Sequence, residues 1–314
     1  MKQTPLLIIL LILTLVCNAQ VPVGSWQSHL PASSFNHVGK LGVKIFAANS
    51  SGVIVYDMDE NSVFQLTKIN QLVDAGISSF KCNDESGVCV IGYENGNIDV
   101  ITSSGQVHNQ PALKNNPVVG KKAITDILFY KNEAFLACGI GLLALDIQTF
   151  NISRDRRFQY NGVRLEMNSI GLYQDTFFFS SPSGLYKSPF DGLFEDSQLQ
   201  QIVTDVDPNT VSQFQEFKDQ LLVLQKIDSL YRGDTLYRYK NNILEKLSVR
   251  IAEGIRHISV KGDSLILVGP DNIGLYDTSF AFQSSIFTYG DDVGIETNEA
   301  QFIDDRNVII ADSK

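Results

Sequence analysis

The sequence predicts an all-β protein, a β-propeller of about seven four-stranded blades. Glycines recur along it at intervals of 44, 45, 43 and then 90 residues, the last being twice 45. Each glycine lies between two short runs rich in Val, Ile, Phe and Tyr, a pattern typical of β-hairpins. A period in the forties built from short strands indicates one four-stranded sheet per repeat. The glycines are Gly52, Gly96, Gly141, Gly184 and Gly274.

Each repeat has the same predicted parts. The hairpin supplies two middle strands, as in residues 44–48 and 53–57 of the first repeat. A shorter apolar segment before it, such as 77–80 in the second repeat, is the predicted innermost strand, and a more polar run after it, such as 63–66, is the predicted outer strand. Beyond the first twenty residues no window carries a helical apolar stripe of any length, so the blades are expected to lack helices.

The fifth repeat departs from this pattern. Residues 225–234 replace the glycine turn with the longer segment Q-K-I-D-S-L-Y-R-G-D, which predicts a lengthened hairpin. Because long loops on a rigid scaffold often carry binding function, Lys226, Tyr231 and Arg232 are candidate binding residues. A surface insertion without function is the favoured alternative, because lengthening a loop costs little free energy.

Residues 1–19 are predicted to be a secretory signal peptide. Lys2 precedes an apolar core at residues 6–16, and small residues occupy the cleavage positions before Gln20. The mature chain is therefore expected to be exported, to the periplasm or the outer-membrane cell surface. Lipidation of Cys17 is the weaker alternative, since a lipid-modified cysteine follows a small residue and Val16 stands there instead.

The propeller domain is predicted to occupy residues 20–314 and to be incomplete. The 295 residues that follow the signal peptide make about 6.7 repeats of 44. The last blade is therefore expected to be truncated at the C-terminus. Residues 26–30, which include Trp26, are predicted to close the ring beside the strands at 300–311, because propellers hide their sheet edges.

The charge of the chain limits its partners. A formal net charge of −10 excludes a nucleic-acid-binding protein, because phosphate neutralisation requires a basic surface. The densest basic stretch contains Arg154, Arg156 and Arg157, which are candidate contacts for an anionic sugar or phosphate. A solvated loop is the favoured alternative for these arginines, since most surface charges have no partner molecule.

No catalytic constellation is visible. The sequence has no G-x-S-x-G, H-E-x-x-H, C-x-x-C or phosphate-binding loop. The four histidines fall in different repeats without ligand spacing and are interpreted as structural or surface residues. We therefore expect a non-enzymatic protein without a metal or cofactor. The aspartates that recur near the third strands are interpreted as turn residues: Asp57, Asp99, Asp146 and Asp277.

Three cysteines remain after cleavage of the signal peptide. Cys82 and Cys89 flank the turn segment N-D-E-S-G and could form a disulfide, which an exported protein permits. Strand register decides whether their Cβ atoms come within bonding distance, and the unbonded state is favoured. Cys138, where other repeats carry small residues, is expected to be a small buried residue.

Two segments carry a resemblance to a known family. They are V-I-G-Y-E-N-G-N-I-D-V-I at residues 90–101 and A-F-L-A-C-G-I-G-L-L-A-L-D at residues 134–146. Together with G-S-W-Q-S-H-L-P at residues 24–31 and the signal ending N-A-Q, they resemble the N-terminal propeller of the PorZ family, a component of the type IX secretion system of Bacteroidetes.

The resemblance implies a surface scaffold. Members of this family carry a second propeller and a C-terminal domain, which are expected beyond the end of this chain. They belong to an attachment complex with a PorU-like sortase and PorV-like and PorQ-like partners, and an anionic lipopolysaccharide is their implied ligand. The acidic balance of this chain means that such a ligand would need a local basic or hydrogen-bonding patch.

Two other functions are compatible with the sequence. A periplasmic sensor propeller of a hybrid two-component regulator has the same style of repeat, and a downstream transmembrane helix and kinase would identify it. A propeller enzyme such as a lyase or glycosidase lacks a visible acid–base pair. The sequence beyond Lys314 would separate these hypotheses most directly.

Overall fold

The structure is a computed structural model that describes residues 34–190, 195–227, 234–249, 254–269, 272–287, 297–304 and 307–312. All of them belong to one compact unit, Pro31–Lys314. The predicted signal peptide and the predicted closing strand at residues 26–30 lie outside the described residues.

The described residues form six four-stranded antiparallel sheets, each in chain order. The sheets are β1 (His37–Leu41), β2 (Lys44–Asn49), β3 (Gly52–Asp57) and β4 (Ser62–Thr67); β5 (Ile77–Asn83), β6 (Val88–Tyr93), β7 (Ile98–Thr102) and β8 (Val107–Gln110); β9 (Ile124–Tyr130), β10 (Glu133–Cys138), β11 (Gly141–Asp146) and β12 (Ile152–Arg156); β15 (Ser169–Tyr173), β16 (Thr176–Ser181), β17 (Gly184–Pro189) and β18 (Gln200–Ile202); β19 (Val211–Phe217), β20 (Gln220–Gln225), β21 (Thr235–Lys240) and β22 (Ile243–Lys246); β23 (His257–Lys261), β24 (Ser264–Val268), β25 (Asn272–Tyr276) and β26 (Phe282–Phe287).

Little else is regular in this part of the chain. Two further sheets have two strands each, β13 (Gln159–Tyr160) with β14 (Val163–Arg164) and β27 (Thr297–Phe302) with β28 (Val308–Asp312). The helical turns are α2 (Ala112–Asn115) and two 3₁₀ turns, Asp196–Gln198 and Pro208–Thr210. The predicted all-β class is confirmed.

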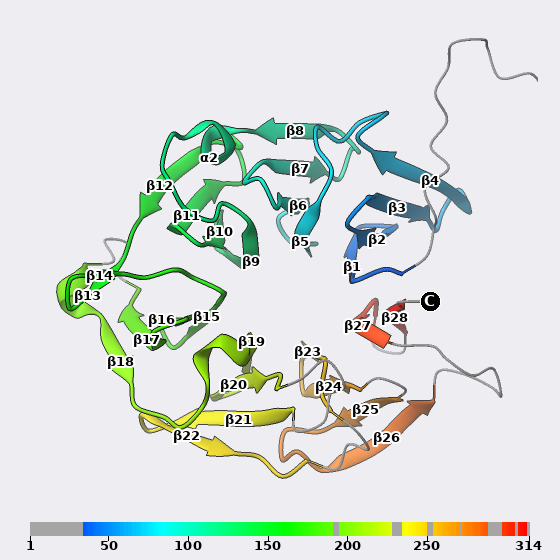
Figure 1. The fold of residues 1–314 in the computed structure, drawn as a ribbon. Coiled ribbons are helices and arrows are strands. Elements are labelled where there is room, and N and C mark those ends of the chain that lie inside the picture. Colours follow the sequence, from blue (N-terminus) through cyan, green and yellow to red (C-terminus); the bar gives the residue numbers. More distant parts are fainter. Residues whose placement is uncertain are drawn as a thin grey trace, which may run out of the picture. The chain divides into compact units, whose positions relative to one another are not determined.

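The first strands of the sheets form a closed inner ring. β1, β5, β9, β15, β19, β23 and β27 contact one another in turn, and β27 contacts β1. Figure 1 shows these strands facing a common axis while β4, β8, β12, β22 and β26 lie outside. The described residues hold six complete blades and the β27–β28 pair, so the β-propeller is confirmed, whereas the predicted count of about seven blades is not.

Side chains on the inner strands join neighbouring blades. Ser78 donates to the Ile124 carbonyl at 2.8 Å, Thr125 to the Met167 carbonyl at 3.0 Å, and Gln213 to the Ile258 carbonyl at 2.7 Å. The partners lie 46, 42 and 45 residues apart, which is the period read from the sequence. Apolar clusters lie between successive sheets, where the alternating side chains of one blade meet those of the next. Blade packing is therefore a nearest-neighbour interaction repeated around the axis.

The turn glycines are required by geometry. Gly141 has a φ of +135°, a backbone conformation that other residues rarely adopt, and a Cβ atom there would collide with the Arg156 carbonyl oxygen. Gly52 at the start of β3 is restricted in a similar way by the Leu66 carbonyl oxygen, whereas Gly274 of the sixth repeat lies inside β25 and is not a turn residue. In the fifth repeat β20 and β21 flank the predicted lengthened hairpin, most of which lies outside the described residues.

The two cysteines of the second blade form a disulfide, contrary to the favoured unbonded state. Cys82 of β5 and Cys89 of β6 are direct partners in the strand register, with Cα atoms 3.9 Å apart. Six residues separate the two cysteines, namely the strand pair Asn83 and Val88 and the four turn residues 84–87, and this spacing brings the cysteines opposite each other. Cys138 is a free, fully buried thiol that donates to the Gly141 carbonyl at 3.2 Å.

One of the predicted turn aspartates has a different role. Asp57, Asp146 and Asp277 accept hydrogen bonds from backbone amides two residues on, as a turn residue does. Asp99 instead lies inside β7, is fully buried, and accepts bonds from Tyr93, Asn109 and the Val73 amide. The interpretation was wrong for Asp99 because it is the second residue of β7, whereas Asp57 and Asp146 are the last residues of β3 and β11.

Gly39 of β1 packs directly against the disulfide of the next blade. A Cβ atom at Gly39 would lie 2.6 Å from the Cys82 Sγ atom and 3.2 Å from the Phe80 ring. We expect Gly39→Ala to lower the free energy of unfolding by about 1–3 kcal/mol, the usual cost of overpacking. Urea unfolding measures this loss.

The control repeats the substitution in a chain that also carries Cys82→Ala and Cys89→Ala. Removing the sulfur atoms frees the space, so the added cost of Gly39→Ala should shrink in that background. An equal cost in both backgrounds would refute the proposed steric cause.

Candidate functional site

A polar cavity lies on the propeller axis. Its volume is about 360 Å³, and the inner strands β1, β5, β9, β19, β23 and β27 contribute to its wall. Its charged and ionisable lining residues are His37, Lys81, Asp126, Lys226, Arg256, His257 and Glu299. The ring topology gathers these side chains from blades that are up to 262 residues apart in the chain.

Glu299 is the centre of a hydrogen-bonded group in this cavity. Its carboxylate lies 3.1 Å from the His37 Nδ1 atom and 3.8 Å from the His257 Nε2 atom, and the Gln301 amide donates to it at 2.5 Å. Burial raises the pKa of Glu299, but attraction to His257 and the contacts with His37 and Gln301 outweigh it and hold the pKa below its usual value. Glu299 is therefore ionised at neutral pH.

His257 is held in its neutral form. Burial lowers its pKa to about 4; Glu299 opposes this, while Lys226, Lys81 and His37 lower the pKa further. The two lysines come from different blades, since Lys81 is on β5 and Lys226 directly follows β20. The pKa of His257 is therefore lowered by burial first and by the basic side chains of the cavity second.

The cationic side chains differ in how they are held. Arg256 is 3% exposed and donates to the Thr297 carbonyl at 3.0 Å, which fixes its position beside β27. Lys226 follows β20 directly, and burial lowers its pKa. Lys81 is on β5 and lines the same cavity.

Asp126 is the second carboxyl group of the cavity. It accepts hydrogen bonds from the Ile170 amide at 2.9 Å and from the Ser169 hydroxyl at 3.2 Å, so it ties β9 to the next blade. Burial raises its pKa, although Lys81 and these hydrogen bonds oppose the shift. Asp126 therefore takes up a proton at a higher pH than an exposed aspartate does.

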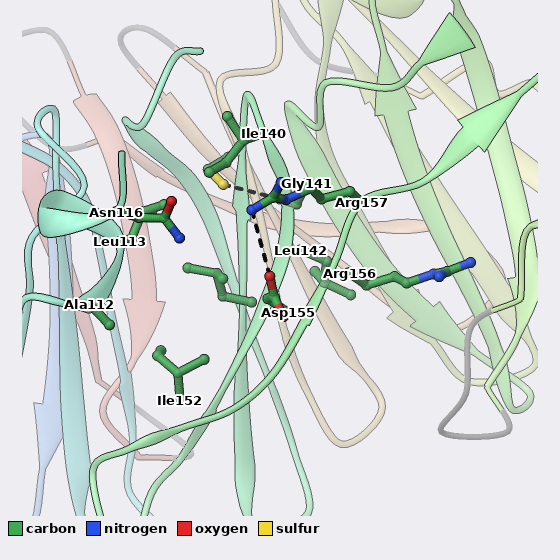
Figure 2. Close-up of a pocket in the computed structure, with 12 residues that line it drawn as sticks. Ala112, Leu113, Asn116, Ile140, Gly141, Leu142, Ile152, Asp155, Arg156 and Arg157 are labelled. Atoms are coloured by element: carbon green, nitrogen blue, oxygen red, sulfur yellow. Dashed lines mark hydrogen bonds and ion pairs between the residues drawn. The ribbon is translucent and has the colours of Figure 1, made fainter. Parts of the chain in front are cut away.

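A second cavity lies between the second and third blades. It has a volume of about 230 Å³ and is lined by apolar residues of α2, β11 and β12, including Leu113, Leu142 and Ile152. Figure 2 shows Arg157 turned over Gly141 towards Asp155, whose carboxylate is 3.9 Å away, while the Arg156 side chain extends in the other direction. Cys138 also lines this cavity.

The structure places the predicted binding residues in different surroundings. Arg154 pairs with Glu133, Arg156 with Asp196 at 2.9 Å, and Arg157 with Asp155. These three arginines therefore do not combine into one cationic surface. Lys226 lies in the axial cavity, and Tyr231 and Arg232 lie outside the described residues. A binding role for these six residues stays a prediction.

Sequence reasoning missed most of the axial cavity. Lys81, Asp126, His257 and Glu299 occur singly in different repeats, so no local motif marks them. A signal was nevertheless present, because each lies in a predicted innermost strand or directly beside one. Aligning the innermost strands of the repeats would have placed these polar residues around one axis.

Comparison with known proteins supports the fold. The family model described as "TSS9, PorZ, N-terminal beta-propeller domain" matches residues 45–198. Over these residues the chain is similar to the PorZ N-terminal β-propeller family. The resemblance inferred from the two sequence segments is thereby confirmed, since both segments lie inside the matched range.

Solved structures show the same architecture. PorZ of Porphyromonas gingivalis, described as an essential bacterial surface component of the type IX secretion system, matches with a TM-score of 0.71 and 19% identity over 92% of this chain. The chain spans 37% of the length of that protein. No curated protein sequence matches the chain.

Other propellers are similar as well. The extracellular domain of a hybrid two-component system from B. thetaiotaomicron has a TM-score of 0.63 and 13% identity, covering 89% of this chain and 39% of that one. The computationally designed Ika8 protein has a TM-score of 0.59 and 13% identity, covering 90% and 94%. Likeness at such identities shows a shared fold and leaves function open.

Within the described ranges, no group of three or more His, Cys, Asp or Glu side chains is arranged to hold a metal ion. No helix among the described residues has the length and apolar character needed to cross a bilayer.

Proposed function

We propose that the chain is a non-enzymatic binding domain of an exported type IX secretion component. The observation that carries the proposal is the match of residues 45–198 to the PorZ propeller family. The rigid ring of blades and the polar axial cavity suit recognition, because a propeller presents loops and a central opening on a fixed scaffold.

The finer parts of the proposal follow from the family. The partners are a PorU-like sortase and PorV-like and PorQ-like proteins at the periplasmic or cell-surface side of the outer membrane, and an anionic lipopolysaccharide is the candidate glycan ligand. Residues 1–19 act as the export signal. We assign β27 and β28 to a seventh blade, because β27 contacts both β23 and β1 in the inner ring.

The second candidate is a sensor propeller of a hybrid two-component regulator. The similarity to the extracellular domain from B. thetaiotaomicron favours it. Its lower TM-score and lower sequence identity make it the weaker candidate.

Deleting the gene in the source bacterium tests the secretion role. We expect cargo proteins with type IX C-terminal signals to keep those signals and to be lost from the cell surface, as measured by immunoblotting of surface and culture fractions. Reintroducing the intact gene is the control and should restore attachment.

Two results would contradict the proposal. Normal maturation and attachment of cargo in the deletion strain would exclude a secretion role. A defect confined to transcription of a glycan-use operon would identify the sensor function instead.

A further inference from the structure

The axial cavity has an unusual charge for this protein. Its lining includes three basic side chains, Lys81, Lys226 and Arg256, and two carboxyl groups, Asp126 and Glu299. The chain as a whole carries a formal charge of −10. A cation-rich cavity in an acidic protein concentrates positive potential, because the low-dielectric walls focus the field.

Existing hydrogen bonds occupy the two carboxyl groups. Asp126 is held by backbone and hydroxyl donors of the next blade, and Glu299 by His37 and Gln301. The two lysines therefore have no ion pair at 4 Å or less with a described carboxylate. A half-buried ammonium that lacks both full hydration and an ion pair gains from an anionic partner.

From this arrangement we infer that the axial cavity binds a compact oxyanion, a phosphate or the phosphate group of a small sugar, through Lys81, Lys226 and Arg256. The guanidinium of Arg256 is fixed by the Thr297 carbonyl and is therefore pre-oriented. The lysines supply movable ammonium groups that adjust to the anion. A volume of about 360 Å³ accommodates a ligand of sugar-phosphate size.

The neutral polar side chains of the wall fit such a ligand. Asn36, Gln215 and Asn298 also line the cavity and can bond to sugar hydroxyls, since amides both donate and accept. The inference is independent of the secretion role, because it rests on the charges and contacts of the cavity alone.

Isothermal titration calorimetry with sodium phosphate, glucose 1-phosphate and glucose tests the inference. We expect binding of glucose 1-phosphate, of inorganic phosphate, or of both, and none of glucose. Binding of both assigns the site to the phosphate group itself, and binding of glucose 1-phosphate alone assigns it to a sugar phosphate. Failure of both phosphates to bind would overturn the inference, and so would equal binding of glucose and glucose 1-phosphate.

Three variants locate the site. Lys226→Met should weaken phosphate or glucose 1-phosphate binding roughly tenfold or more, because it removes a charge-assisted contact. Lys121→Met is the matched control: this lysine is 79% exposed, pairs with Glu166 and does not line the axial cavity, so binding should be unchanged.

Glu299→Gln is expected to strengthen anion binding, whereas a misfolded variant would only lose binding. The substitution removes a negative charge from the cavity while keeping the shape of the side chain, so anion binding should tighten severalfold. Binding that is unaltered in both Lys226→Met and Glu299→Gln would place the anion elsewhere and overturn the inference.

Discussion

Replacing Asp99 with alanine is expected to destabilise the propeller more than any other single change considered above. The carboxylate is fully buried and accepts hydrogen bonds from the Tyr93 hydroxyl at 2.6 Å, the Asn109 amide at 2.7 Å and the Val73 backbone amide at 3.0 Å. The substitution leaves these donors unpaired in the second blade. We expect a loss of about 3–5 kcal/mol in the free energy of unfolding, as when one partner of a buried charged network is removed.

The Tyr93 hydroxyl keeps its proton, and so remains a donor to Asp99, at acidic and neutral pH. Burial and the adjacent Asp99 carboxylate raise the pKa of Tyr93 well above its usual value, so the proton stays on the phenol. Tyr93→Phe removes only this bond and should cost about 1–2 kcal/mol.

Asp146→Ala is the matched control for Asp99→Ala. Asp146 ends the third strand of its own blade, as expected of a turn residue, and its carboxylate bonds to the amides of Gln148 and Thr149 at an exposed turn. Its removal should cost much less, because water replaces the lost bonds. Urea unfolding of the variants gives the comparison, and equal losses at both sites would contradict the argument.

Acidification should weaken the fold through His257. An unfolded histidine titrates near 6.5, whereas burial lowers the pKa of His257 to about 4. As the pH falls between these values, the unfolded chain takes up a proton that the folded chain does not. Stability contributed by this group is therefore complete above about pH 6.5 and is lost as the pH falls towards 4, by an amount on the order of 3 kcal/mol.

Urea unfolding at several pH values between 4 and 7 measures this dependence. His257→Gln should flatten the curve in that window, because the titrating group is gone. Glu299, whose pKa is lowered, adds a further loss in the unsubstituted protein only as the pH falls below the usual carboxyl range. His108→Gln is the control, since His108 lies on the outer strand β8 and stacks on Phe150; the same flattening there would argue against His257.

The fold could be predicted because its signal is local and repeated. A glycine turn between two apolar runs specifies a hairpin wherever it occurs, and Gly141 shows the steric reason. The bond between Cys82 and Cys89 was harder to foresee, because a shift of one residue in register would separate the two sulfur atoms.

The candidate site depends on contacts that no local pattern encodes. Glu299 and His37 meet only because the ring closes, and each is unremarkable within its own strand. The basic cluster of Arg154, Arg156 and Arg157 is visible in the sequence, but the acidic partner of each arginine is not. These partners are Glu133 at the start of β10, Asp196 in a 3₁₀ turn, and Asp155 within the cluster itself. The cluster of arginines in the sequence therefore did not predict a positive surface potential, because carboxylates pair with the arginines in the folded chain.

Closure of the inner ring also sets the order in which contacts can form during synthesis of the chain. The Asn298 side chain donates to the Phe35 carbonyl at 2.9 Å, and these residues are 263 apart in the chain. At about 5–20 residues per second, synthesis separates them by roughly 13–50 s. Each blade can pair its own strands soon after its residues are synthesised. The contact between β1 of the first blade and β27 can form only after β27 has been synthesised. During that interval an open edge is exposed to solvent, where it could pair with another chain.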